Sequence, residues 1–150
     1  MESFDYVWAS HDVIETLLAQ LRTRGAHPEG VAALNLLAGQ VSLAGRDYAE
    51  AEARLREYLA RSRRSDGAAW LDGYARLLLG SALVGQKRFA DAEPQLLAGS
   101  AGVAAAPMQT RRLALWKVGE IYEFAGRSDM ADAWKAKYGS HPKRPVTNPR

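Results

Sequence analysis

The chain contains no cysteine, and this absence excludes a disulfide framework, thiol catalysis and cysteine-ligated zinc. Histidine is also scarce, with only His11, His27 and His141 in 150 residues. His11 and Glu15 have the i, i+4 spacing of two ligands on one helical face, but HDVIE is not an HExxH motif and lacks a third ligand. We therefore expect neither a metal site nor a cofactor.

Long apolar runs are missing as well. No stretch approaches the ~20 apolar residues that a bilayer span requires. The first residues, MESFDYVWASHDV, have no basic segment followed by an uninterrupted apolar one, so no signal peptide is visible. Together with the absence of cysteine, these features predict a cytoplasmic protein that does not contact the membrane.

Acidic residues are absent from the last twelve positions, and this explains the basic character of the chain. The net charge of +3 and the pI near 9.3 come from Lys143, Arg144 and Arg150, because residues 1–138 hold 17 basic and 17 acidic side chains. A neutral folded part disfavours nucleic-acid binding. Residues 139–150 carry three prolines and no periodicity, so we predict one domain over 1–138 and a mobile tail after it.

Strand and hairpin signals are lacking, whereas helical periodicity runs through the chain. In the second helix, for example, Val31, Leu34, Leu37 and Val41 form one apolar stripe. The segment 70–83 is apolar on two sides, which is typical of a central helix. Pro94 should kink its helix without ending it. The predicted fold is all-α, with about seven helices at 10–24, 31–44, 47–62, 70–83, 89–98, 107–125 and 129–138.

The apolar pattern repeats with a period of 41 residues. Tyr48, Phe89 and Met130 are 41 apart, and so are Ala51, Ala92 and Ala133. A fixed period of this size predicts an array of units that bury their apolar faces against one another.

The residues of these copies resemble the tetratricopeptide repeat family, in which two antiparallel helices pack through small residues. In the middle copy the matching residues are Leu79, Gly80, Leu83, Phe89, Ala92 and Leu96. In the first copy they are Ala38, Gly39, Ser42, Tyr48, Ala51 and Leu55. In the third they are Val118, Gly119, Tyr122, Met130, Ala133 and Lys137, with a turn that is two residues longer.

This resemblance implies a right-handed superhelical array of about three TPR-like helical hairpins, with the helix at 10–24 as an N-terminal cap. Gly39, Gly80 and Gly119 should lie where two helices approach closely, opposite Ala51, Ala92 and Ala133. The middle hairpin, QKRFADAEPQLL, is also similar to helical repeats that follow the kinase domain in some bacterial serine/threonine kinases.

In tetratricopeptide arrays the first helix of each hairpin lines a concave face, so the resemblance implies a partner-binding groove. Its expected residues are Leu36, Gln40, Leu43, Tyr74, Leu77, Ser81, Val84, Trp116, Glu120 and Glu123. Tyr74 and Trp116 are the candidate aromatic anchors, although aromatic residues at helical spacing more often belong to a core. The groove lacks the Lys/Asn/Arg set with which some relatives hold a terminal carboxylate.

No catalytic motif accompanies this pattern. Ser81 is not in a GxSxG elbow, and the chain has neither a glycine-rich phosphate loop after a strand nor a His-Arg-Asp sequence. We expect a bacterial, non-enzymatic scaffold that binds a protein, a peptide or another copy of itself. The alternatives are a regulatory piece of a kinase-associated signalling assembly and, further off, a nucleic-acid-binding protein or an enzyme with an unrecognised site.

A first prediction concerns the two ends of the chain. Repeat arrays need capping elements, so deleting residues 1–25 should cause aggregation or unfolding. Deleting residues 140–150 should leave the melting temperature unchanged. Circular-dichroism melting and light scattering of the two truncated proteins test this, and a stable, soluble protein without residues 1–25 would show that the 10–24 segment is no cap.

Overall fold

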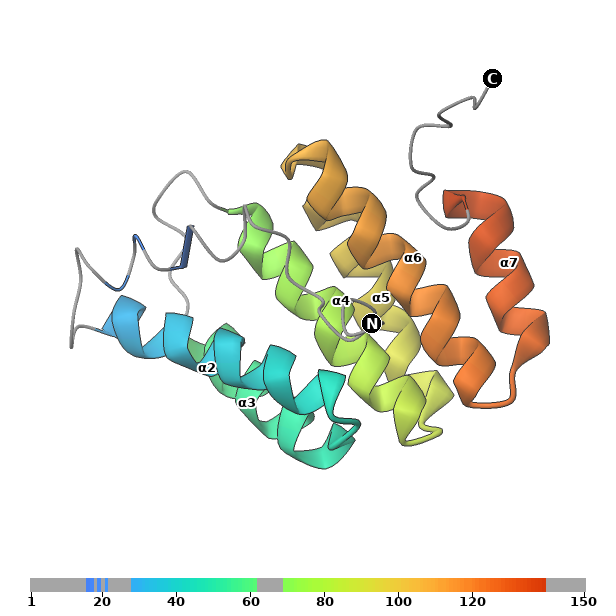
Figure 1. Ribbon diagram of the computed structural model, residues 1–150, viewed down its shortest axis with the longest axis horizontal. Coiled ribbons are helices and arrows are strands. Elements are labelled where there is room, and N and C mark those ends of the chain that lie inside the picture. The colour runs from blue at the N-terminus through green and yellow to red at the C-terminus, as the bar shows by residue number, and fades with distance from the viewer. Residues whose placement is uncertain (1–15, 18, 20, 22–27, 62–68, 140–150) are drawn as a thin grey trace, which may run out of the picture.

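The computed structural model describes residues 16, 17, 19, 21, 28–61 and 69–139, and this part of the chain is all-α, as predicted (Figure 1). Within it, the α-helices are α2 (Pro28–Ala44), α3 (Tyr48–Arg61), α4 (Trp70–Gly85), α5 (Phe89–Gly102), α6 (Met108–Phe124) and α7 (Ser128–Tyr138). A 3₁₀ turn, η2 (Val103–Ala105), joins α5 to α6. The described residues contain no strand.

The predicted first helix, at 10–24, lies largely outside the described residues. Four of its positions, Thr16, Leu17, Ala19 and Leu21, are described and all are helical. Leu17 is fully buried in the hydrophobic core, and Leu21 packs against that core from a partly buried position. The predicted tail at 139–150 also lies outside the described residues, except for Gly139, and so do residues 62–68.

The six helices form three hairpins that lie side by side in chain order, α2/α3, α4/α5 and α6/α7 (Figure 1). The middle hairpin holds the centre of the core, because α4 contacts α2, α3, α5 and α6. From Gly73 to Val84 the only residue of α4 that is not buried is Arg76. The sequence-based interpretation of this segment as a central helix is confirmed.

The turns within the hairpins follow one pattern. At the first, Asp47 Oδ1 accepts a hydrogen bond from the Glu50 backbone N–H at 3.3 Å, as expected of a capping residue. The backbone N–H of Asp47 donates to Ser42, that of Arg88 to Leu83, and that of Arg127 to Tyr122, at 2.9, 2.9 and 3.0 Å. These equivalent bonds align the three hairpins residue by residue.

The alignment corrects the register of the third copy. Forty-one residues separate Asp47 from Arg88, but thirty-nine separate Arg88 from Arg127, so the third turn is not longer than the others. The small buried residue that matches Ala51 and Ala92 is therefore Ala131, and Ala133 is exposed. By the same alignment, Met130 and Lys137 are not the repeat equivalents of Phe89 and Leu96. Ala133 fitted the 41-residue spacing by chance, because α7 is rich in alanine.

The backbones of α4 and α5 approach each other closely, and four glycines make this possible. A Cβ placed on Gly73 would lie 2.5 Å from the backbone carbon of Gly102, and one on Gly99 would lie 2.7 Å from the backbone nitrogen of Leu77. At Gly80 an added Cβ would be 2.5 Å from Leu96 Cδ2. Only Gly80 among these four was expected from the sequence.

This seam also explains why α5 is longer than predicted. The helix passes through Pro94 and runs to Gly102, beyond the expected end at Ala98. The added turn supplies Gly99 and Gly102, whose missing side chains let the backbones of α4 and α5 touch. The kink expected at Pro94 remains a prediction.

The distances from an added Cβ confirm the expected close approach at Gly39 in the first hairpin, and they correct the one expected at Gly119 in the third. An added Cβ on Gly39 would lie 2.8 Å from Leu55 Cδ2, whereas on Gly119 it would have no neighbour nearer than 3.6 Å. Gly119 is therefore not a close-contact glycine. In the first two hairpins the opposite wall is formed most closely by Leu55 and Leu96, one turn after the expected alanines.

A second prediction follows from these distances. Gly73→Ala should destabilise the protein by about 1–3 kcal/mol, because the new methyl group meets backbone that cannot move aside. Gly119→Ala is the matched control and should be neutral or stabilising by up to about 1 kcal/mol, because alanine is the better helix former. Urea unfolding at equilibrium measures both variants, and equal stabilities would contradict the α4–α5 seam.

Candidate interaction surfaces

The structure buries seven of the ten residues that the sequence placed in an open groove. These are Leu36, Gln40, Leu43, Tyr74, Leu77, Ser81 and Val84. Trp116 and Glu120 are partly buried, and Glu123 is exposed. The seven buried side chains offer no open surface, so the expectation of an exposed groove is corrected for them. A partner-binding role for Trp116, Glu120 and Glu123 stays a prediction.

The hairpins pack against one another, mainly through α3 on α4 and α4 on α6, with a smaller contact of α2 on α4. In the turn-based alignment, Leu36, Leu77 and Trp116 occupy one repeat position. This position is buried in α2 and α4, each of which is followed by another hairpin, and is partly exposed in α6. This face is therefore not an open groove in α2 or α4.

Tyr74, one of the two candidate anchors, is a core residue. Its hydroxyl donates a hydrogen bond of 2.5 Å to Gln40 Oε1, across the α2–α4 contact. Burial raises the pKa of Tyr74 well above its ordinary value, so the phenol stays protonated and keeps donating. Ser81 lies on the same helix and is also buried. Its Oγ has no hydrogen-bond partner among the described residues.

In contrast to the buried groove residues, one face of α2 is both apolar and exposed to solvent. Leu34 and Val41, which the sequence placed on one apolar stripe, are 55% and 72% exposed. Their repeat equivalents in α4, Ala75 and Ala82, are fully buried. The equivalents in α6, Ala114 and Ile121, are buried as well. A face that the second and third hairpins bury is thus open on the first.

We call this exposed surface the α2 end face, and define it by Leu34, Ala38 and Val41. The sequence did hold a signal for it. The 41-residue alignment pairs Leu34 and Val41 of this face with the alanines Ala75 and Ala82 in α4. Periodicity alone, however, does not tell which apolar stripe is covered by a neighbouring helix. Position within the array decides that.

At the other end of the array, α6 presents a partly exposed surface that we call the α6 end face, made of Leu113, Trp116, Glu120 and Glu123. The carboxylates on it are paired. Lys117 Nζ, on a nearly buried side chain, lies 3.1 Å from Glu120, and Lys135 Nζ of α7 lies 2.9 Å from Glu123. The Lys117 ammonium also lies 5.0 Å from the centre of the Trp116 ring.

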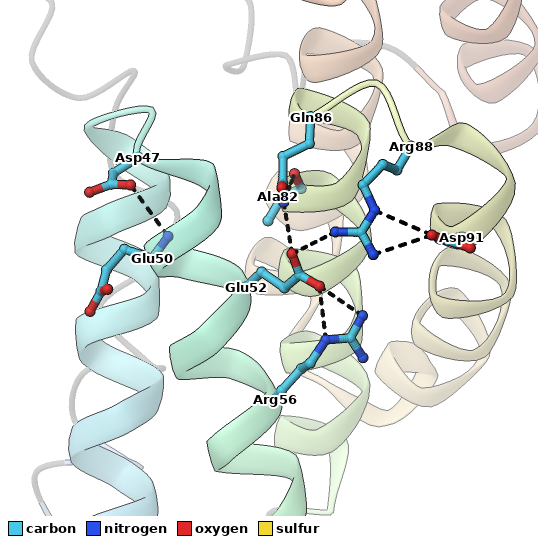
Figure 2. A network of polar contacts seen from close by, with 8 residues as sticks. All are labelled: Asp47, Glu50, Glu52, Arg56, Ala82, Gln86, Arg88 and Asp91. Atoms are coloured by element: carbon cyan, nitrogen blue, oxygen red, sulfur yellow. Dashed lines mark hydrogen bonds and ion pairs between the residues drawn. The ribbon is translucent and has the colours of Figure 1, made fainter.

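A polar cluster joins the first hairpin to the second, and Figure 2 shows it around Glu52 of α3. Glu52 Oε1 accepts hydrogen bonds from Gln86 at 2.9 Å and Arg88 at 2.8 Å, while Oε2 accepts one from Arg56 at 2.9 Å. Arg88 also bonds Asp91 at 3.2 Å. The cluster therefore connects α3 to the turn between α4 and α5.

The environment of Glu52 favours its charged form. Burial by itself would raise the pKa of this carboxyl, but the hydrogen bonds from Gln86 and Arg56 and the charges of Arg88 and Arg56 outweigh burial, and the net pKa is lowered. The Glu52 side chain is only 16% exposed, so solvent screens these interactions less than it screens an ordinary surface pair.

A pocket of about 150 Å³ lies between α5 and α7, and the sequence argument did not predict it. Its lining includes Leu96, Leu97, Tyr122, Trp134 and Tyr138. The polar tips of two of these rings are engaged, because Trp134 Nε1 donates to the Leu115 carbonyl at 2.6 Å and the Tyr138 hydroxyl donates to Ser100 at 3.0 Å. The pocket walls are consequently mostly apolar ring and aliphatic surface.

Within the described ranges, no group of three or more histidine, aspartate or glutamate side chains could hold a metal ion. His11, His27 and His141 lie outside those ranges. No helix in the described part of the chain is long and apolar enough to span a bilayer. Comparisons with protein-family models, curated proteins and solved structures found no match to this chain.

A third prediction concerns Glu52. Glu52→Gln should lower the free energy of unfolding by about 1–2 kcal/mol at neutral pH, because it removes a charged acceptor from three donors. The folded-state pKa of Glu52 is lowered, so this contribution is present above the unfolded-state value of roughly 4 and is lost as the pH falls through the folded-state value. Denaturation from pH 7 to pH 3 should show the two proteins converging.

Glu50→Gln is the control on the same helix. Glu50 pairs with Arg54, and both side chains are nearly half exposed, so the substitution should change stability by less than about 0.5 kcal/mol. A loss at Glu50 equal to that at Glu52 would contradict a special role for the junction between hairpins.

Proposed function

We propose that this chain is a non-enzymatic helical-repeat module that binds another protein through an end of its array. The observation that carries the proposal is the α2 end face. Leu34 and Val41 expose to solvent the face that the two other hairpins bury against a neighbour. A contiguous exposed apolar face on a helix is a usual mark of a protein interaction site.

The arrangement of hairpins supports the same function. Repeat arrays expose unsatisfied apolar faces at their ends unless a capping element covers them. The described residues of the N-terminal segment include the buried Leu17, yet Leu34 and Val41 remain open. The right-handed TPR-like superhelix belongs to this proposal, and it is supported by three consecutive hairpins with equivalent turn hydrogen bonds.

The proposal moves the binding surface away from the groove that the sequence predicted. Seven of the ten groove residues are buried, so they offer no surface to a partner in this structure. The α2 end face needs no rearrangement. Of the predicted set, Trp116 and Glu120 are partly buried and Glu123 is exposed, and all three lie on α6 in the third hairpin.

A fourth prediction tests this function. The full chain is immobilised and cross-linked in an extract of the source cell, and bound proteins are quantified by mass spectrometry. Val41→Asp should abolish capture of the specific partners with the melting temperature unchanged, because a largely exposed side chain contributes little to folding.

Met108→Asp is the matched control, since Met108 is 58% exposed at the start of α6, outside both end faces. It should leave capture intact. If the two substitutions have the same effect on capture, or if neither has any, the α2 end face is not the binding surface and the proposed function fails.

A further inference from the structure

We propose that the pocket lined by α5, α6 and α7 binds a free α-amino acid with an apolar side chain, of about the size of phenylalanine. The apolar interior takes the side chain, and Glu93 and Lys137 of the lining take the ammonium and the carboxylate. This site belongs to the second and third hairpins, whereas the α2 end face belongs to the first. The inference is therefore independent of the proposed function.

The pocket has room for one small apolar group. Three rings, Tyr122, Trp134 and Tyr138, line its volume of about 150 Å³ together with the aliphatic Leu96 and Leu97. An apolar cavity of about this volume is large enough for benzene. Leu97 is 52% exposed, so one wall of the pocket reaches the surface. A ligand with a benzyl-sized end fits, and its polar end stays at the opening.

Hydrogen bonds hold two of the rings in place. Trp134 Nε1 donates to the Leu115 carbonyl of α6 at 2.6 Å, and the Tyr138 hydroxyl donates to Ser100 of α5 at 3.0 Å. These bonds tie α7 to both helices that share the pocket with it. The site is thus formed before a ligand arrives, and a preformed site loses less entropy on binding.

Glu93 brings a carboxylate to the pocket without a protein partner. Its repeat equivalent, Glu52, accepts hydrogen bonds from three side chains (Figure 2). At the equivalent positions around Glu93, Leu97 replaces one of the two arginines, and the other, Arg127, pairs with Asp129 instead at 3.0 Å. Among the residues that the structure describes, none forms a hydrogen bond or ion pair with Glu93.

The Tyr122 hydroxyl is a second unused polar group. Tyr122 is 2% exposed, yet its hydroxyl has no hydrogen-bond partner in the described part of the chain. Burial raises the pKa of this phenol most, the charge of Glu93 raises it further and that of Arg127 lowers it, so the net pKa is raised. The Glu93 carboxylate is thus close enough to act on the hydroxyl. A ligand that bonds an unsatisfied buried hydroxyl recovers the cost of burying it.

Lys137 supplies the opposite charge. It lines the same pocket from α7, and its ammonium lies 5.4 Å from the centre of the Tyr138 ring. It forms no ion pair with Glu93 or with any other carboxylate of the described residues. One carboxylate and one ammonium beside a small apolar pocket match the two charged groups of an α-amino acid. An amine or a carboxylic acid alone would use only one of them.

The fifth prediction is that L-phenylalanine binds the full chain with a dissociation constant below about 2 mM, as expected for a ligand of this size. The measurement is an NMR titration of the ¹⁵N-labelled protein. The reporter is the indole N–H signal of Trp134, which lines the pocket and is assigned with the variant Trp134→Phe. This signal should shift and saturate. A signal that does not move at about five times that concentration would overturn the proposal.

Two derivatives of the ligand identify the chemistry that is recognised. L-Phenylalanine amide keeps the ammonium, like the first residue of a peptide, and N-acetyl-L-phenylalanine keeps the carboxylate, like the last residue. Each should bind about two- to fivefold more weakly than L-phenylalanine, at the scale of an exposed ion pair. If either derivative binds as well as the free amino acid, the ligand is a peptide end and the proposal is wrong.

Three protein variants locate the contacts. Glu93→Gln should weaken binding of L-phenylalanine and leave that of the N-acetyl derivative unchanged, and Lys137→Gln should weaken binding of L-phenylalanine and leave that of the amide unchanged. Tyr122→Phe should weaken binding without lowering the melting temperature, because the fold leaves this hydroxyl unpaired. A charge variant that weakens all three ligands equally would contradict the assigned contacts.

Filling the pocket is the test of its place. Ala133 lines the pocket from an exposed position, so Ala133→Leu should abolish binding with the melting temperature unchanged. Ala136→Leu is the matched control, because Ala136 is exposed on the same helix and outside the lining. It should bind L-phenylalanine like the wild type. Equal binding by the two variants would show that the ligand binds elsewhere and would overturn the proposal.

Discussion

The structure depends on the contact between α4 and α5, where two helices touch through their backbones. Gly73 meets Gly102 and Gly99 meets Leu77 at distances that leave no room for a side chain. A close approach of this kind brings many atoms into van der Waals contact, and it removes the freedom of the two helices to slide. The middle hairpin is thereby a rigid centre on which the first and third hairpins pack.

The burial of α4 on all sides determines which surfaces remain for a partner. Because α2, α3 and α6 all pack on α4, nearly every side chain of α4 is buried between hairpins. Among the described first helices, α2 leaves its end face exposed, and α6 leaves its end face partly exposed. The exposed apolar side chains of the α2 end face are the usual consequence of a repeat architecture, whose terminal units lack a neighbour on one side.

Polar side chains form directional hydrogen bonds at the contacts between hairpins, where the packing is otherwise apolar. The Glu52 cluster connects α3 to the turn after α4, so it ties the first hairpin to the second by charged hydrogen bonds (Figure 2). The equivalent positions carry Glu93 and Arg127 at the next junction. At Asp47 the sign of the charge changes, and the outermost turn therefore differs from the inner two in what it can pair with.

The sequence by itself determined the helices, the existence of three related hairpins and the central place of α4, because these follow from local periodicity, capping residues and a repeat that needs no distant contact. It did not determine the register of α7, since alanine at both 131 and 133 fits a small-residue pattern and only the turn hydrogen bond of Arg127 selects the first. Nor did it distinguish a buried apolar stripe from an exposed one. Leu34 and Val41 have the same period as core residues, and Tyr74 and Leu77 have the same chemistry as groove residues. Whether such a side chain is buried depends on which helix lies beside it, and that neighbour is set by tertiary packing around α4.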